Sequence, residues 1–239
     1  LFWGLLALVT LAGALKPHLG ALLAYFALSA ALIAGNAPAA GCVLLAATAA
    51  WWYFTGRLGD ADANATLVPP LAGAFGFNQL TPLVAGFCLP PARAFGALAF
   101  SLLVSVLLAS CGSYSLLGWD ALANWQFSAG LDVQVGIGSL LMQPALWCIV
   151  VSWIAATGAL SAFRLRPTRA FAVLGTLVAS ALLLAGIVLA AWVASGQATW
   201  MPSFNNLVFT VVPIVAMLLM CVRVPEPDWG NEEDYEGEA

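Results

Sequence analysis

Long stretches of this chain contain no ionisable side chain, and this feature limits its fold more than any other. The seven basic and eleven acidic residues fall in short connections and in one acidic tail. Between them lie eight apolar segments with no Asp, Glu, Lys, Arg or His in their interiors. The segments cover approximately residues 1–15, 19–35, 38–54, 67–89, 94–110, 137–163, 169–195 and 205–222.

The composition predicts a membrane protein. With 63% apolar residues, 8% charged residues and a mean hydropathy of +0.98, the chain lies far from soluble proteins, in which about 25% of residues are charged. A helix needs about 20 apolar residues to cross a bilayer, and its backbone groups must find their partners within the segment. We therefore expect an all-α fold: a polytopic integral membrane bundle of about eight transmembrane helices with the lipid bilayer as its main partner.

The two ends of the chain differ in character. The first apolar run begins at Leu1, is short for a span and lacks the basic flank of a signal peptide. This favours a membrane domain over residues 1–223 that is truncated upstream, where a cytoplasmic domain would precede it. The alternative is a complete short protein numbered from a processed end. Residues 224–239 contain acids and no basic residue, which is typical of a disordered, solvated tail that repels anionic lipid and nucleic acid.

Arginine placement predicts the orientation, because short cytoplasmic loops are enriched in Lys and Arg. If both ends lie inside, the outer loops hold only Lys16 and Arg57. The inner loops then carry Arg93, Arg164, Arg166, Arg169 and Arg223. We therefore predict a multi-pass protein of the cell membrane with both ends in the cytoplasm.

Two of the predicted inner turns share a pattern at an offset of 76 residues. Pro at a first helical turn needs no amide donor, and the arginine that follows stays at the headgroup level. Parallel repeats occur in transporters, but Pro-x-Arg is also a common way to begin a span, so duplication stays open. The pattern runs Phe87, Leu89, Pro91, Arg93, Ala94, Phe95 and recurs as Phe163, Leu165, Pro167, Arg169, Ala170, Phe171.

Uncharged amides are the only strongly polar groups within the predicted spans. Pro82 is expected to free a backbone carbonyl near Asn78, which would place a polar group in mid-span. One interpretation is an uncharged intramembrane site; the other is ordinary hydrogen bonding between helices, worth about 0.6 kcal/mol per contact. The candidate residues are Asn78, Gln79, Pro82, Gln143, Asn205 and Asn206.

Catalysis is not expected within these residues. The single histidine, His18, lies in a short turn, and no carboxylate falls within a span, which argues against intramembrane proteolysis and proton coupling. The five cysteines have no paired spacing that would hold a metal, and no phosphate-binding Gly-rich loop is present. We therefore predict no catalytic, metal or cofactor-binding residue here.

Four short stretches of the chain carry a resemblance to a known class of membrane domain. The stretches are Trp51-Trp52-Tyr53-Phe54 with Gly56-Arg57, Leu71 to Gly76, Pro82 to Gly86 before Pro91-x-Arg93, and Gly112-Ser113 with Gly118-Trp119. They resemble the multi-span C-terminal membrane domain that follows the catalytic domain in some bacterial serine/threonine protein kinases. The resemblance implies a membrane anchor and possible sensor module of a larger cytoplasmic signalling protein. No kinase motif occurs in the chain, so no catalytic residue is implied. The alternatives are a small permease for a neutral solute and a structural membrane protein.

Overall fold

The computed structural model is helical throughout the part of the chain that it describes. This part comprises residues 17–34, 38–54, 79–110, 137–138, 141–164, 168–196, 200–202 and 204–223. It contains no strand. Its helices are α2 (Pro17–Ala34), α3 (Pro38–Phe54), α5 (Leu80–Cys88), α6 (Pro91–Ser110), α9 (Pro144–Arg164), α10 (Arg169–Ala194) and α11 (Phe204–Arg223).

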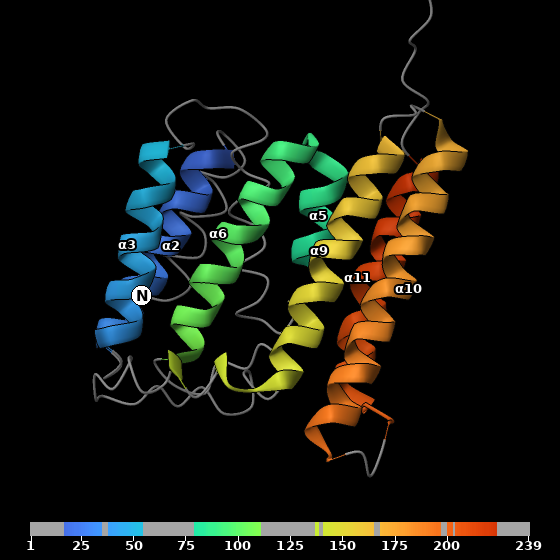
Figure 1. Cartoon of the computed structure of the whole chain (residues 1–239). Coiled ribbons are helices and arrows are strands. Elements are labelled where there is room, and N and C mark those ends of the chain that lie inside the picture. The colour runs from blue at the N-terminus through green and yellow to red at the C-terminus, as the bar shows by residue number, and fades with distance from the viewer. Residues whose placement is uncertain are drawn as a thin grey trace, which may run out of the picture.

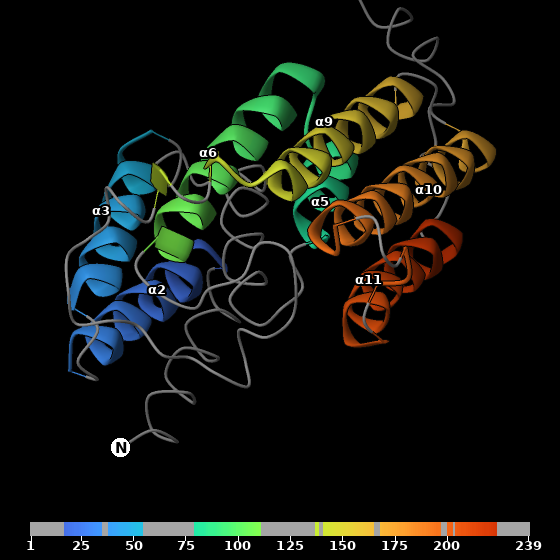
Figure 2. The same ribbon diagram turned by 60° about the horizontal axis from the view of Figure 1, so that its bottom comes forward.

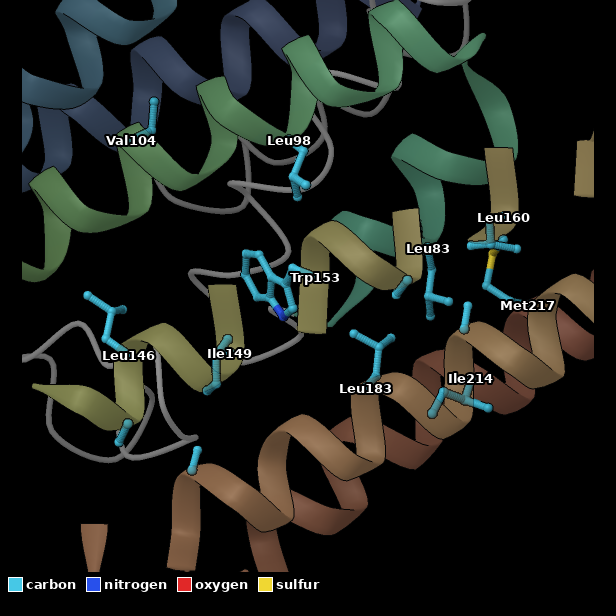
Figure 3. Packing of buried hydrophobic residues seen from close by; sticks show 14 of the residues in the cluster. Leu83, Leu98, Val104, Leu146, Ile149, Trp153, Leu160, Leu183, Ile214 and Met217 are labelled. Atoms are coloured by element: carbon cyan, nitrogen blue, oxygen red, sulfur yellow. The ribbon is translucent and has the colours of Figure 1, made fainter. Parts of the chain in front are cut away.

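Helix α9 lies at the centre of the arrangement. It contacts α5, α6 and α10, and both views place it between α6 and α10 (Figures 1 and 2). The α2–α3 pair packs on α6 at one side, and α11 packs on α10 at the other. Trp153, in the middle of α9, is fully buried. Figure 3 shows Leu98 of α6 and Ile149 of α9 near its ring.

Proline sets the start of several helices. Pro17, Pro38, Pro91 and Pro144 are the first residues of α2, α3, α6 and α9, a position where the missing N–H has no intrahelical acceptor. Helix α3 has the predicted bounds, and α2, α6, α10 and α11 begin and end within three residues of their predictions.

Two predicted segments agree with the structure only in part. Of the segment 67–89, the structure describes residues 79–89, in which α5 begins at Leu80; residues 67–78 lie outside the described part. In the segment 137–163, residues 137, 138 and 141 are helical, Gln143 is not, and α9 begins at Pro144, because proline disfavours helical backbone at the residue before it. The predicted span 1–15 lies outside the described residues.

Helix length and composition support membrane association only weakly. Within the described ranges, two helical stretches, Pro144–Phe163 and Arg169–Ala194, are long and apolar enough to cross a membrane. The other apolar stretches are shorter: Leu22–Ala34, Pro38–Tyr53, Pro91–Leu107 and Asn206–Val222. The all-α prediction is therefore confirmed for the described residues, whereas a bundle of eight spans is not established.

Helix ends that carry arginine lie together. Helix α6 begins, α9 ends, α10 begins and α11 ends at the top of Figure 1. We call these four helix ends the arginine end; its residues are Arg93, Arg164, Arg169 and Arg223. Arg166 lies outside the described residues. Helix α2 ends and α3 begins at the opposite end, so α3 runs towards the arginine end (Figure 1). Helix α5 runs in the same direction (Figure 1). The sequence predicts opposite directions for the segments 38–54 and 67–89.

Candidate functional site

The structure does not gather the predicted polar residues into one site. Gln79 and Pro82 are buried where α5 meets α9. Gln143 is exposed beside the start of α9, ten residues before Trp153, which corresponds to about 15 Å along a helix. Asn206 is half-buried in the first turn of α11. Asn78 and the side chain of Asn205 lie outside the described part.

The strongest polar contact joins Gln79 to α9. The indole Nε1 of Trp153 donates a hydrogen bond to Oε1 of Gln79 at 2.9 Å. Gln79 is 6% exposed and Trp153 is 0% exposed, so neither group has ready access to solvent. A buried Trp N–H requires a partner, and leaving it unpaired would cost about 1–3 kcal/mol. The contact therefore anchors the start of α5 to the middle of α9.

A second contact lies one turn further along α5. Thr157 Oγ1 donates to the carbonyl oxygen of Pro82 at 3.4 Å. Beyond it, a Cβ atom added at Gly86 would lie 2.8 Å from Cβ of Leu160 and 3.0 Å from the carbonyl oxygen of Thr157. Glycine thus allows α5 and α9 to approach closely, as small residues do between membrane helices.

Pro82 lies in the first turn of α5, which begins at Leu80. The backbone carbonyl near Asn78 that the sequence expects Pro82 to free lies outside the described residues. The amide groups of a first turn have no intrahelical acceptor, and the missing N–H of proline therefore costs nothing there. The carbonyl of Pro82 instead accepts the bond from Thr157.

Most of the other buried hydroxyls are satisfied within their own helices. Ser29, Thr48 and Thr210 donate to the carbonyl four residues earlier, at 2.7–2.8 Å, a common arrangement for such residues in helices. The hydroxyls of Ser101 and Ser161 are buried and have no hydrogen-bond partner.

The sequence analysis did not identify Trp153 and Thr157 as part of the site. Trp153 offered a usable signal, because tryptophan in membrane proteins concentrates near the interfaces. Trp153 lies near the midpoint of α9, which is unusual for tryptophan, and its buried N–H needs an internal acceptor. The partner could not be read from the sequence, since Gln79 lies 74 residues away.

The chemistry of the site is limited to hydrogen bonding. Gln79, Trp153 and Thr157 do not exchange protons with substrates at neutral pH, so the contact serves to position helices or to bind an uncharged group. Among the described residues, no group of three or more His, Cys, Asp or Glu comes together.

Comparisons of the chain with protein-family models, with curated proteins and with solved structures find no match. A functional proposal for the chain therefore rests on its sequence and on the contacts described above.

Proposed function

We propose that the chain is a multi-pass integral membrane domain that anchors a larger cytoplasmic signalling protein, such as a serine/threonine kinase, and acts as its sensor module. The observation that carries the membrane part is an inverted distribution of polar groups. The described helices hold polar side chains inside and large apolar side chains outside.

Hydroxyl side chains within these helices are buried. No described helix contains Asp, Glu or Lys, and each Arg lies at or near a helix end. Every Ser and Thr within the described helices is buried except Ser110, which ends α6 and is half-buried. Ser and Thr are mostly exposed in water-soluble proteins, so this distribution is the reverse of that in a soluble bundle.

The outer surface is correspondingly apolar. Val151, Leu103 and Val222 are 62%, 59% and 65% exposed, and they lie on three different helices. A helix on the surface of a soluble protein presents charged or polar residues outward, whereas a helix in lipid presents side chains such as these. Helices α2, α3, α6 and α11 have 17–20 residues, within the range of about 17–25 that a bilayer requires; this supports several crossings.

The anchoring role is supported by the limited chemistry of the described helices. It is also supported by the resemblance, around Trp51 and Pro91, to the membrane domain that follows the catalytic domain in some bacterial serine/threonine protein kinases. Any catalytic activity would belong to a domain outside these residues. The acidic residues after Val224 would face the cytoplasm in this arrangement.

A permease for a neutral solute is the second candidate, and one observation favours it. Helix α5 has nine residues and begins beside the midpoint of α9 with a buried carboxamide. Transporters often place binding groups at the ends of helices near the middle of the membrane. Uptake of neutral solutes into vesicles should collapse in Gln79→Leu if this candidate holds; unchanged uptake removes Gln79 from any transport path.

Labelling from the two sides of the membrane tests the proposal. In a cysteine-free variant, cysteines placed at Arg93 and at Gln143 lie at opposite ends of the described bundle. We expect a membrane-impermeant maleimide to label Cys at position 143 from outside intact cells and Cys at position 93 only after permeabilisation. Labelling of both from outside would contradict a crossing by α9, and extraction of the chain by alkaline carbonate would contradict integral insertion.

A further inference from the structure

We infer that the start of α5, together with the hydroxyl of Ser101 on α6, binds a small neutral molecule through a carbonyl oxygen such as that of an amide. The binding site rests on the proposed sensor role in the membrane, and it gives that role a ligand class and a position in the bundle.

The start of α5 is a buried helix end. Helix α5 begins about midway along the bundle (Figure 1), and Gln79, Thr81 and Pro82 are buried there. The first N–H groups of a helix have no intrahelical acceptor, and Gln79, the N-cap residue, makes no side-chain hydrogen bond to them. A helix start also carries a partial positive charge. This end of α5 therefore favours an electron-rich atom in front of it.

The hydroxyl of Ser101 is an independent sign of a ligand. Ser101 is 0% exposed, and its Oγ has no hydrogen-bond partner. Serine in a helix commonly donates to a carbonyl of the preceding turn, as the equally buried Ser29 does. An unpaired buried hydroxyl is unfavourable and calls for a partner that the protein itself does not supply.

Ser101 lies on the face of α6 that packs against α5. Ala94 and Ala97 of α6 belong to one buried cluster with Ala85 of α5 and Leu89, which follows α5. Ser101 comes seven residues after Ala94 and four residues after Ala97. Residues at these spacings share one side of a helix. The hydroxyl is therefore on the α5 side of α6.

The hairpin also brings Ser101 level with the start of α5. Ser101 is ten residues after Pro91, the first residue of α6, which corresponds to about 15 Å along the helix. The nine residues of α5 cover about 14 Å, and the two helices run in opposite directions from their common turn (Figure 1). Side chains lean towards the start of their own helix, which for Ser101 is the direction of the first turn of α5.

The groups around this position are uncharged and mainly donate hydrogen bonds. Oε1 of Gln79 accepts the bond from Trp153, and the amide group of Gln79 carries two further donors. Arg93 lies eight residues before Ser101, about 12 Å along α6, so an anion here would lose its hydration without a counter-charge. A carbonyl oxygen accepts hydrogen bonds without carrying a net charge. Water fits less well because its own two hydrogens would need acceptors.

Protection of an introduced thiol tests the site in the full chain. A cysteine-free variant carrying Ser101→Cys is reconstituted in lipid vesicles and treated with methyl methanethiosulfonate, a small neutral reagent, and mass spectrometry follows the reaction. We expect the thiol to react, and acetamide at about ten times its dissociation constant to slow the reaction about tenfold. Acetate, an anion of similar size, should not slow it. Ser29→Cys is the matched control and should not react, because Ser29 is equally buried but has a partner within α2.

Binding to the reconstituted wild type gives a second measurement. Carbonyl-labelled acetamide that is held by the protein gives an immobilised signal in solid-state NMR. Ser101→Ala should weaken this binding about fivefold, because one hydrogen bond to the ligand is lost. Ser29→Ala should leave the binding unchanged.

Several results would overturn the inference: an unreactive thiol in Ser101→Cys, equal protection by acetate and acetamide, or unchanged acetamide binding by Ser101→Ala. Reaction without any protection would mean that only water occupies the site, and equal reaction of Ser29→Cys would mean that the whole bundle opens; both contradict it as well. Flotation with the vesicles separates these results from a failure of the proposed function. Protein that floats but does not bind acetamide lacks only the site, whereas protein that does not float contradicts the proposed membrane location.

Discussion

The α5–α6 and α9–α10 hairpins share a sequence pattern at their turns but differ in their first helices. Helix α5 has nine residues, whereas α9 has 21. In both hairpins the second helix begins within two residues of the repeated proline and carries its arginine in the first turn. The shared pattern therefore fixes the turn and the start of the second helix.

The residues at the start of the first helix differ between the two hairpins. Helix α9 begins at Pro144, and Gln143 before it is exposed. Helix α5 begins after Gln79, which is buried and accepts a hydrogen bond from Trp153 of α9. The following variants test how much this buried contact between α5 and α9 contributes to stability compared with the exposed start of α9.

The largest effect is expected from overpacking the α5–α9 contact. Gly86→Leu should lower the free energy of unfolding by about 3 kcal/mol, because the backbone of Thr157 leaves no space for a side chain. Gly96→Leu on α6 is the matched control, since nothing lies within 4 Å of a Cβ atom there. Unfolding in mixed detergent micelles measures both; equal effects in the two variants would disprove close α5–α9 packing.

Loss of the buried hydrogen bond should have the next largest effect. Trp153→Phe and Gln79→Leu should each cost about 1–3 kcal/mol, since each leaves one buried polar group unpaired. The double variant should cost less than the sum of the two, and the same unfolding assay gives the coupling energy. Strict additivity would mean that the two side chains do not interact.

The start of α10 should respond more weakly. Thr168 is the N-cap of α10, and its side chain accepts a 3.4 Å hydrogen bond from the backbone N–H of Phe171. Thr168→Ala should cost about 1 kcal/mol. Thr168→Ser, which retains the hydroxyl, should restore most of the stability; if the Ser variant is no more stable than Ala, the cap contributes nothing.

The smallest effect is expected at the exposed end of α9. Gln143→Ala should change the free energy of unfolding by less than about 0.5 kcal/mol, because Gln143 is exposed. Gln79→Ala, measured alongside, should cost at least twice as much. If the two variants change the free energy of unfolding by similar amounts, burial of Gln79 adds nothing to stability.

The sequence predicts the parts of this fold that depend on local signals. The bounds of α3 and the starts of α6 and α10 follow from proline and from the edges of apolar runs. Pro144 carries the same signal as Pro17, Pro38 and Pro91. The start of α9 can therefore be predicted from the sequence, although the predicted segment 137–163 begins before Pro144.

The parts that depend on distant residues could not be predicted. Gln79 and Trp153 are far apart in sequence, and nothing near either residue specifies the other. The first-turn position of Pro82 follows from the start of α5 at Leu80. The separation of Gln143 from Gln79 likewise depends on how α5 and α9 pack, not on the type of residue.

The shortness of α5 has a consequence for the order in which the protein is made. A nine-residue helix is about 14 Å long, roughly half the thickness of the hydrocarbon core, so in the proposed membrane location these nine residues cannot cross the bilayer by themselves. The hydrogen-bond partner of Gln79, Trp153, is synthesised 74 residues later, about 4–15 s later at ordinary translation rates. During that interval the nascent chain lacks α9, the helix against which α5 packs.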